Sequence, residues 1–278
     1  MSFKYQPEFD FCLEIARNAG SQIKDAFYKA KNVVNKSSVV DLVTETDQNV
    51  ENFLIKSINN RFPEHEFIGE ESVAASGGAK ITITDKPTWV VDPVDGTTNF
   101  VHQFPHTAVC IGFMVNKITE FGVVFNPITD ELFSARLGQG ANLNDDKIVI
   151  NSCSPKSIRG TLIITEFGSS TDPTKMDFVF DNMKRVKDQG SHGMRSMGSC
   201  ALNICLVACG RADAFYEAGM HIWDICAASI VLREAGGVTV GMHGEELNLC
   251  ERKIIAASNM ELAQDLAKCT TDIDLIGD

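Results

Sequence analysis

The chain has 278 residues, of which 44% are hydrophobic, and its formal net charge is −12 at pH 7. This length can bury a substantial core, and the negative charge argues against nonspecific binding to nucleic acid or anionic membrane, since both are polyanions. The sequence has no run of about 18 uncharged apolar residues and no basic start followed by an apolar stretch. We therefore expect a soluble protein without a membrane span, located in the cytoplasm.

Nine cysteines are scattered along the chain without the C-x-x-C spacing of a zinc site. We expect most of them to be reduced thiols packed in a cytosolic fold. Cys153 and Arg159 are separated by five residues, which is the C-x5-R spacing of a phosphate-binding cysteine loop. Spacing alone does not establish a cysteine nucleophile, because the thiol must also be activated to the thiolate, and we assign none.

The first part of the chain combines helical and strand patterns. Apolar residues recur at helical spacing over 8–32, and a second helix is predicted from about Thr44 to Phe62, before Pro63. Strands are expected at 67–68, 89–91, 106–116, 119–126 and 130–136, with a hairpin turn at Asn116 and Lys117. These elements predict a helix pair on a largely antiparallel sheet, which we assign to an N-terminal lobe over residues 1–150.

From about residue 160 the pattern changes to alternation of strands and helices. Strands are expected at 161–165, 191–195, 212–216, 237–240 and 254–257, and helices at 173–187, 199–209, 222–235 and from about 260. Such alternation is typical of α/β structure. We predict a C-terminal α/β lobe over residues 151–278, and a fold class of α+β / α/β for the whole chain.

The most informative segment is W-V-V-D-P-V-D-G-T-T-N-F at 89–100. An apolar strand leads to Asp92 and Asp95, and Gly96 and Thr97 can open a helix whose free backbone N–H groups bind anions. Carboxylates are ligands that Mg²⁺ prefers, so the segment offers a metal site beside a phosphate site. A plain turn with an Asp N-cap would have the same short sequence, and this alternative stays open on the motif alone.

Three further acidic residues are candidates for the same site. Glu70 follows a short apolar strand, Asp47 lies at the start of the second predicted helix, and Asp224 lies in the first turn of an apolar helix. Each has a simpler alternative. A paired loop glutamate is usually solvated, and carboxylates at helix starts often cap the helix.

The order of these motifs resembles that of the inositol monophosphatase family. G-E-E-S at 69–72, the segment at 89–100, W-D-I-C-A-A at 223–228 and E-A-G-G at 234–237 follow one another as in that family, and shorter matches extend over nearly the whole chain. The resemblance implies a layered α-β-α-β-α sandwich of the sugar-phosphatase type and a homodimer. It also implies two or three Mg²⁺ ions per subunit and inhibition by lithium.

The resemblance also implies roles for individual residues. Glu70, Asp92 and the carbonyl of Val94 would hold a first metal ion, and Asp92 would bridge to a second ion that Asp95 and Asp224 complete. The catalytic residues would be Thr97, Asp47 and Glu70, with Thr97 and Asp47 orienting and deprotonating the attacking water. The substrate-binding positions would be Asp95, Gly96, Thr97, Ser169, Gly198, Cys200, Glu217 and Asp224. At position 200 the cysteine departs from the alanine usual in the family.

The expected reaction is hydrolysis of inositol monophosphate to inositol and phosphate by metal-activated water, without a covalent phosphoenzyme. Alternatives are galactose 1-phosphate, a sugar bisphosphate or a nucleotide 3′-phosphate as substrate. Glu217 favours a small polyol or sugar phosphate, because a carboxylate accepts hydrogen bonds from hydroxyls whereas a second phosphate would call for Lys or Arg. A non-catalytic regulatory scaffold is an alternative of another class, although every metal-ligand position is filled.

Overall fold

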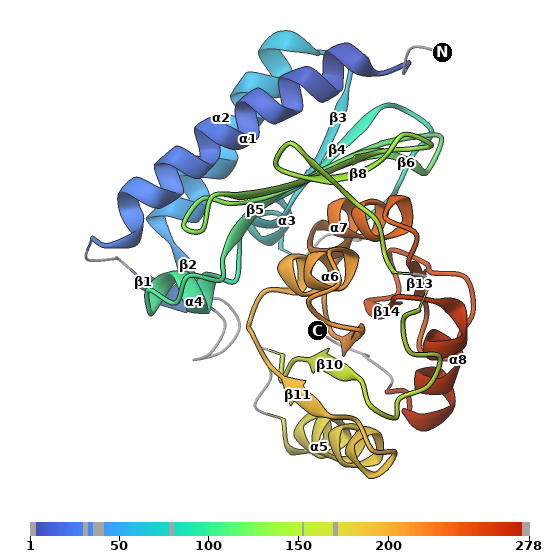
Figure 1. Cartoon of the computed structure of the whole chain (residues 1–278). Helices are drawn as coiled ribbons and strands as arrows, with labels where there is room; N and C mark the ends of the chain where they lie inside the picture. The colour runs from blue at the N-terminus through green and yellow to red at the C-terminus, as the bar shows by residue number, and fades with distance from the viewer. Residues whose placement is uncertain are drawn as a thin grey trace.

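The computed structural model describes residues 4–29, 33–35, 42–77, 81–151, 153–168 and 172–273. Its helices and two large sheets form five layers (Figure 1). The outer helices α1 (Gln6–Phe27) and α2 (Glu45–Arg61) cover one face of a seven-stranded sheet. Helices α6 (Cys200–Ala208) and α7 (Ile222–Glu234) lie between the two sheets. The predicted α-β-α-β-α sandwich is thereby confirmed.

The seven-stranded sheet is largely antiparallel, as predicted, with one parallel pair at its edge. Its order is β3 (Glu66–Gly69), β4 (Thr88–Asp95), β5 (Ala108–Val115), β6 (Ile118–Asn126), β7 (Glu131–Arg136), β8 (Gly140–Leu143) and β9 (Asp146–Ile148). The predicted hairpin turn joins β5 to β6, and its residues Asn116 and Lys117 have φ of 51° and 65°. The strands β8 and β9, and a separate pair of β1 (Val33–Asn35) with β2 (Leu42–Thr44), were not predicted.

The five-stranded sheet is mixed. Its order is β11 (Gly193–Arg195), β10 (Leu162–Thr165), β12 (Ala214–Ala218), β14 (Lys253–Ala257) and β13 (Val238–Val240). Strand β10 is parallel to both neighbours, whereas β14 is antiparallel to β12 and β13. Helices α5 (Pro173–Asp188) and α8 (Met260–Cys269) cover its outer face. Among the described helices, none combines the length and apolar character needed to cross a bilayer.

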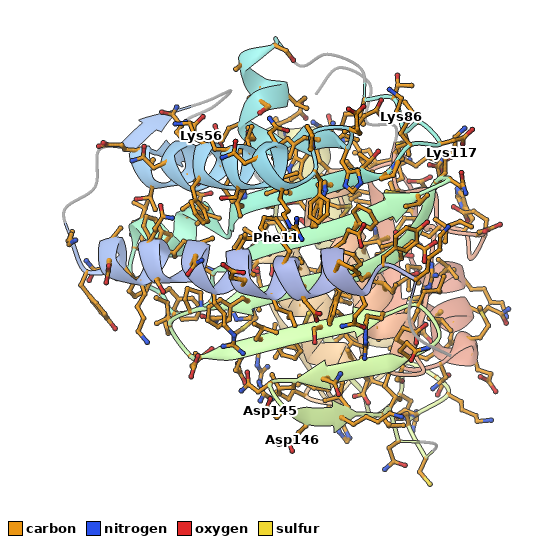
Figure 2. The ribbon with its side chains drawn as sticks, turned by 90° about the horizontal axis from the view of Figure 1, so that it is seen from above. Phe11, Lys56, Lys86, Lys117, Asp145 and Asp146 are labelled. Atoms are coloured by element: carbon orange, nitrogen blue, oxygen red, sulfur yellow. The ribbon has the colours of Figure 1, made fainter. Side chains whose placement is uncertain are left out.

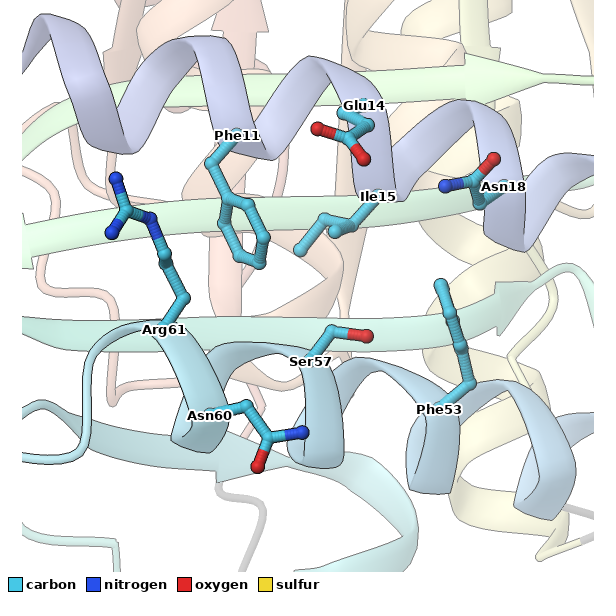
Figure 3. Close-up of a pocket in the computed structure, with 8 residues that line it drawn as sticks. All are labelled: Phe11, Glu14, Ile15, Asn18, Phe53, Ser57, Asn60 and Arg61. Carbon is cyan, nitrogen blue, oxygen red and sulfur yellow. The ribbon is translucent and has the colours of Figure 1, made fainter.

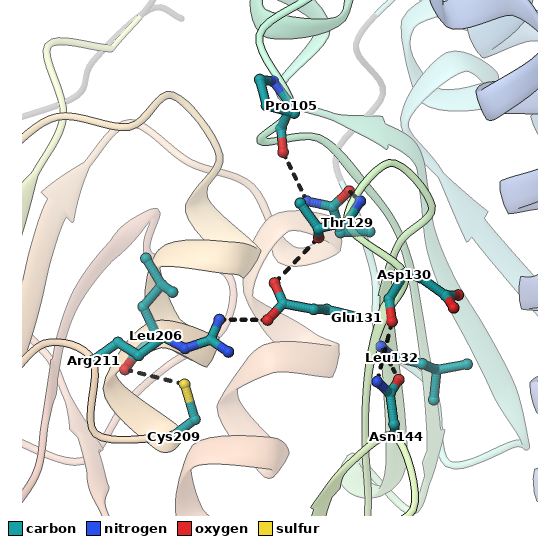
Figure 4. Close-up of polar contacts among 10 residues, drawn as sticks. Pro105, Thr129, Asp130, Glu131, Leu132, Asn144, Leu206, Cys209 and Arg211 are labelled. Carbon is teal, nitrogen blue, oxygen red and sulfur yellow. Dashed lines mark hydrogen bonds and ion pairs between the residues drawn. The ribbon is translucent and has the colours of Figure 1, made fainter.

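The two halves of the chain meet through helices and through polar contacts. Arg211, between α6 and β12, forms an ion pair of 2.5 Å with Glu131 on β7, and Thr129 donates a hydrogen bond to the same carboxylate (Figure 4). Because α6 and α7 pack on both sheets, the division at residue 150 stays a prediction. All nine cysteines are free thiols and five of them are buried, consistent with the expected reduced state.

The helix pair packs on an aromatic cluster. Phe11 lies between α1 and α2 (Figure 2), with its ring centroid 5.4 Å from that of Phe62 and 6.3 Å from that of Trp89. Helix α1 ends at Phe27 rather than at the predicted residue 32. The reason is that Tyr28 leaves helical geometry and the buried apolar spacing stops at Phe27.

Two facing glycines bring helix α7 against the backbone of the seven-stranded sheet. Gly112 on β5 and Gly122 on β6 are register partners. A Cβ atom on Gly112 would lie 2.6 Å from the sulfur of Cys226, and one on Gly122 would lie 2.4 Å from the carbonyl oxygen of Ala227. Any larger residue would therefore push α7 away from the sheet.

We predict that Gly122→Ala lowers the free energy of unfolding by about 1–3 kcal/mol, because the added methyl group meets helix backbone that cannot rotate away. Chemical denaturation followed by circular dichroism measures the change. Gly193→Ala on β11 is the matched strand control, since its Cβ would meet only side-chain ends at 3.2 and 3.3 Å. Equal stability of the Gly122→Ala variant and the wild type would contradict this account of α7 packing.

Candidate active site

Three carboxylates converge where β4 ends and α7 begins. Single oxygens of Asp92, Asp95 and Asp224 all lie within 4.8 Å of one another. Asp92 is 1% exposed and Asp95 is 5% exposed, so little water separates their charges. Such a set of oxygen ligands is suited to a hard divalent cation.

The path of β4 explains how two of these carboxylates come together. The strand continues through Asp95, four residues beyond the predicted end, and its register with β5 shifts between Asp92 and Asp95. Strand β3 ends opposite Val91, so Pro93, which has no N–H, lies beyond the parallel partner. The predicted turn lies later, at Gly96 with φ of 84°. The irregular register lets both carboxylates serve one site.

Burial and mutual repulsion disfavour the charged forms of these acids. Burial, more than the charge of Glu70 or of neighbouring carboxylates, raises the pKa of Asp95 to about 6 and that of Asp224 to about 8. Burial likewise raises the pKa of Asp92, which shares a hydrogen bond with Asp224. The cluster therefore needs protons or cations to neutralise it, and the residues fit a bound divalent metal.

Glu70 lies beside this cluster rather than in it. It is the first residue of α3 (Glu70–Ala75), directly after β3, and its side chain is half-buried. Its charge raises the pKa of Asp92, Asp95 and Asp224. Glu51 on α2 fixes this helix start, because its two carboxylate oxygens accept hydrogen bonds from Glu71 N at 2.8 Å and Ser72 N at 2.7 Å.

Asp47 and Thr97 form a pair beside the carboxylates. Asp47 Oδ2 accepts a hydrogen bond of 3.0 Å from Thr44 N, so the capping alternative is also confirmed. Its other oxygen, Oδ1, accepts from Thr97 Oγ1 at 3.1 Å, and that hydroxyl also lies 3.0 Å from the carbonyl oxygen of Val94. Burial raises the pKa of Asp47 to about 7. Asp47 thus combines a structural contact with an oxygen directed at Thr97.

Asp224 likewise caps its helix while facing the cluster. Its Oδ2 accepts a hydrogen bond of 2.5 Å from His221 N at the start of α7. The capping alternative stated for this residue is therefore confirmed, and it does not exclude a place in the cluster. The one carboxylate caps the start of α7 and contributes an oxygen to the site.

Most of the predicted substrate positions surround the cluster. Asp95 Oδ2 accepts from Ala201 N at 2.9 Å, and Oδ1 accepts from Cys200 N at 3.2 Å, so the start of α6 is joined to the carboxylates. A Cβ atom on Gly96 would lie 2.9 Å from the carbonyl oxygen of Gly198, which explains the need for glycine there. Ser169 lies outside the described residues.

Glu217 lies at the end of β12 with an oxygen left for a ligand. Its Oε2 atom is enclosed and has no hydrogen-bond partner among the described residues. Burial raises its pKa well above the usual value, with further contributions from Glu166 and Asp224. Cys200 is buried nearby, and burial raises the pKa of its thiol, which argues against a reactive thiolate.

Several residues at this site were not predicted from the sequence. Glu51, Asn99, Glu166 and Ser199 all make hydrogen bonds to the segments that carry the predicted site residues. Glu166 directly follows the predicted strand 161–165, and a carboxylate at the end of a parallel strand was the available indication. The other three have side chains of common surface types, and their partners lie far away in the sequence.

A groove elsewhere on the molecule lacks this chemistry. It has a volume of about 350 Å³ and lies between α1 and α2 (Figure 3), where Phe11, Ile15 and Phe53 line it with Glu14, Asn18, Ser57, Asn60 and Arg61. Helix α2 contributes its later turns to this groove, whereas Asp47 lies in its first turn. None of the predicted site residues lines it.

Comparison with known proteins gives a consistent result. The sequence profile of the Inositol monophosphatase family matches residues 4–274. Inositol monophosphatase 1 of Homo sapiens is 47% identical over 268 residues, covering 96% of this chain and 95% of that protein. Among solved structures, the extragenic suppressor protein suhB from Bartonella henselae has a TM-score of 0.84 at 28% identity, covering 95% of this chain and 98% of that one. Inositol monophosphate-bound SaIMPase-II from Staphylococcus aureus has a TM-score of 0.78 at 26% identity, with coverage of 95% and 93%.

We predict that the metal-free protein unfolds at a higher temperature at about pH 5 than at pH 8. The raised pKa values of Asp95 and Asp224 mean that the folded state binds protons which the unfolded chain releases. This stabilisation is full below the usual carboxyl pKa of 3.8 and is lost as the pH rises through about 6 and about 8. Thermal unfolding in EDTA measures the dependence.

A divalent cation should replace those protons, so Mg²⁺ should raise the unfolding temperature more at pH 8 than at pH 6. The double variant Asp92→Asn with Asp224→Asn is the control, because it removes two of the repelling charges and should flatten both effects. An unfolding temperature in EDTA that rises steadily from pH 5 to pH 8 would contradict the assignment.

Proposed function

This chain belongs to the inositol monophosphatase family, and from this premise we propose that it hydrolyses inositol monophosphate to inositol and phosphate. It is a hydrolase of phosphoric monoesters from a metal-dependent family whose members act on phosphorylated small molecules. The observation that carries the proposal is the cluster of Asp92, Asp95 and half-buried Asp224 beside the pair of Thr97 and Asp47.

We propose that Mg²⁺ is the metal and that two or three ions bind per subunit. Glu70, Asp92 and the carbonyl of Val94 would hold one ion, and Asp95 and Asp224 would join Asp92 at a second. The chemistry that Mg²⁺ supplies at such a site is Lewis-acid stabilisation of phosphoryl charge and acidification of water. The raised pKa values of the carboxylates support this assignment, because a cation offsets both the burial and the repulsion that disfavour their charged forms.

Thr97 and Asp47 would prepare the attacking water. Thr97 Oγ1 donates toward Asp47 Oδ1, so its lone pairs can accept a hydrogen bond from water and orient it. Asp47 Oδ2 is occupied by Thr44, which leaves Oδ1 as the atom that receives the proton. A pKa of about 7 suits a group that must accept a proton near neutral pH.

The remaining site residues would bind the substrate. The backbone N–H groups of Gly96 and Thr97 would contact the phosphate, and Gly198, Cys200 and Ser169 would contact the polyol. Glu217 would accept hydrogen bonds from substrate hydroxyls, which its unpartnered Oε2 supports. Hydrolysis of galactose 1-phosphate, a sugar bisphosphate or a nucleotide 3′-phosphate is the alternative within the family. The homodimer, the cytoplasmic location and lithium inhibition stay predictions.

We predict that Asp92→Asn reduces turnover by several orders of magnitude, because it removes charge at both proposed metal positions. Phosphate release is measured with myo-inositol 1-phosphate, galactose 1-phosphate, fructose 1,6-bisphosphate and 3′-phosphoadenosine 5′-phosphate, first with Mg²⁺ and then with EDTA. The wild type should prefer the inositol ester and be inactive in EDTA. Asp146→Asn on the exposed strand β9 is the control for an acid-to-amide change. Retention of more than about a tenth of the activity by Asp92→Asn would refute the two-metal assignment.

We predict that Glu217→Gln lowers kcat/KM for myo-inositol 1-phosphate about tenfold to a hundredfold, because a neutral amide accepts hydrogen bonds less strongly than a carboxylate. Nitrophenyl phosphate has no neighbouring hydroxyls, so its kcat/KM should barely change. Parallel assays of both substrates make the comparison. Equal losses on the two substrates would instead mean that Glu217 supports the metal site or the fold.

A further inference from the structure

We propose that Glu166 is a positioning residue that fixes the loop of residues 196–200, and that this geometry makes the site selective for polyol phosphates. The inference rests on the proposed function, because the loop carries two of the residues expected to contact the polyol, Gly198 and Cys200. Glu166 itself is not among the residues expected to touch substrate. It acts through the loop.

The topology brings Glu166 to the site. Strands β11, β10 and β12 are parallel, so their carboxyl ends meet at one edge of the sheet. Glu166 follows β10, the 196–200 loop follows β11, and Glu217 lies near the end of β12. This edge of the sheet therefore carries Glu166, Glu217 and the loop that leads from β11 to the start of α6.

The carboxylate of Glu166 is saturated by donors from this one segment. Its Oε1 atom accepts hydrogen bonds from Met197 N at 2.7 Å, Gly198 N at 2.8 Å and the side-chain amide of Asn203 at 2.7 Å. Its Oε2 atom accepts from the hydroxyl of Ser196. Two consecutive backbone N–H groups on one charged oxygen determine the orientation of the 197–198 peptide.

The same loop also makes hydrogen bonds to Asp95 on β4 and to Asn99 on the helix that follows this strand. Asn99 on α4 (Thr97–Val101) donates to the carbonyl oxygens of Met197 and His106, both at 2.7 Å. The hydroxyl of Ser199 and the amides of Cys200 and Ala201 donate to Asp95. The loop is thus hydrogen-bonded to both Glu166 and Asp95. Loss of the Glu166 contacts should therefore move Gly198 and Cys200 relative to the carboxylate cluster.

The two glutamates at this edge differ in their hydrogen bonding. Glu166 has its acceptors filled by protein donors, whereas Glu217 Oε2 has no partner among the described residues. Burial raises the pKa of Glu217, and the charge of Glu166 adds to this effect. Glu166 takes the donors of Ser196, Met197 and Gly198, and the Cys200 thiol contacts Glu217, while Glu217 Oε2 is left for substrate hydroxyls.

The test compares Glu166→Ala with Glu166→Gln. A glutamine oxygen can still accept from Met197 N and Gly198 N, while its NH₂ group can donate to the Ser196 hydroxyl, so the loop should keep its geometry. Alanine removes every contact. Glu261→Ala on the exposed surface of α8 is the matched control for loss of a glutamate.

Hydrogen exchange followed by mass spectrometry measures the loop without any substrate. The amides of Met197 and Gly198 should exchange at least about tenfold faster in Glu166→Ala, and close to the wild-type rate in Glu166→Gln and Glu261→Ala. In kinetics, Glu166→Ala should raise KM for myo-inositol 1-phosphate about tenfold or more, with kcat/KM for nitrophenyl phosphate within about threefold of wild type. Glu166→Gln should restore the wild-type KM.

Three results would overturn the proposal: unchanged exchange in Glu166→Ala, equal losses on both substrates, or a Glu166→Gln variant as impaired as the alanine variant. Failure of the proposed function has a different signature, because the wild type itself would then show no preference for the inositol ester. In that case the same kinetic comparison uses the panel substrate that the wild type prefers, and the exchange experiment is unaffected.

Discussion

Carboxylates whose oxygens lie within 4.8 Å of one another repel strongly when they are buried, because little water screens them. Backbone N–H groups partly offset this repulsion, with a different donor at each carboxylate. Asp95 is opposed by the first N–H groups of α6, Asp224 accepts the His221 N–H at the start of α7, and Asp92 accepts the N–H of Val94. These contacts hold the carboxylates in place but leave excess negative charge. A divalent cation bound by these oxygens would neutralise that excess charge.

Much of this arrangement could be predicted from the sequence, because the relevant patterns are local. Helical spacing identified α1 and α2, turn residues identified the hairpin at Asn116 and Lys117, and motif order identified the carboxylates. The end of β4 was placed too early because proline and glycine usually end strands. Here the neighbouring strand β3 stops first, and that fact depends on pairing between segments rather than on the segment itself.

The supporting residues were the part that sequence patterns could not supply. Glu51 is separated by about twenty residues from the amides it accepts, and Glu166 by about thirty. In isolation each resembles a solvated glutamate, the most common fate of that side chain. Only the packing of α2 beside α3, and of β10 beside β11, shows that these carboxylates accept backbone N–H groups. Long-range hydrogen bonds of this kind have no short sequence pattern.

The split origin of the carboxylate cluster has a consequence for the protein during its synthesis. Asp92 and Asp95 leave the ribosome about 130 residues before Asp224, which at about 5–20 residues per second is a delay of roughly ten seconds. During this interval the nascent chain contains β4 but not yet α7, the helix that packs on the same sheet. The uncovered glycine surface of β5 and β6 and the incomplete ligand set would then persist together until α7 docks. Docking of that helix would cover this face of the sheet and bring Asp224 to the cluster in the same event, so packing of α7 and completion of the carboxylate set are coupled in the newborn chain.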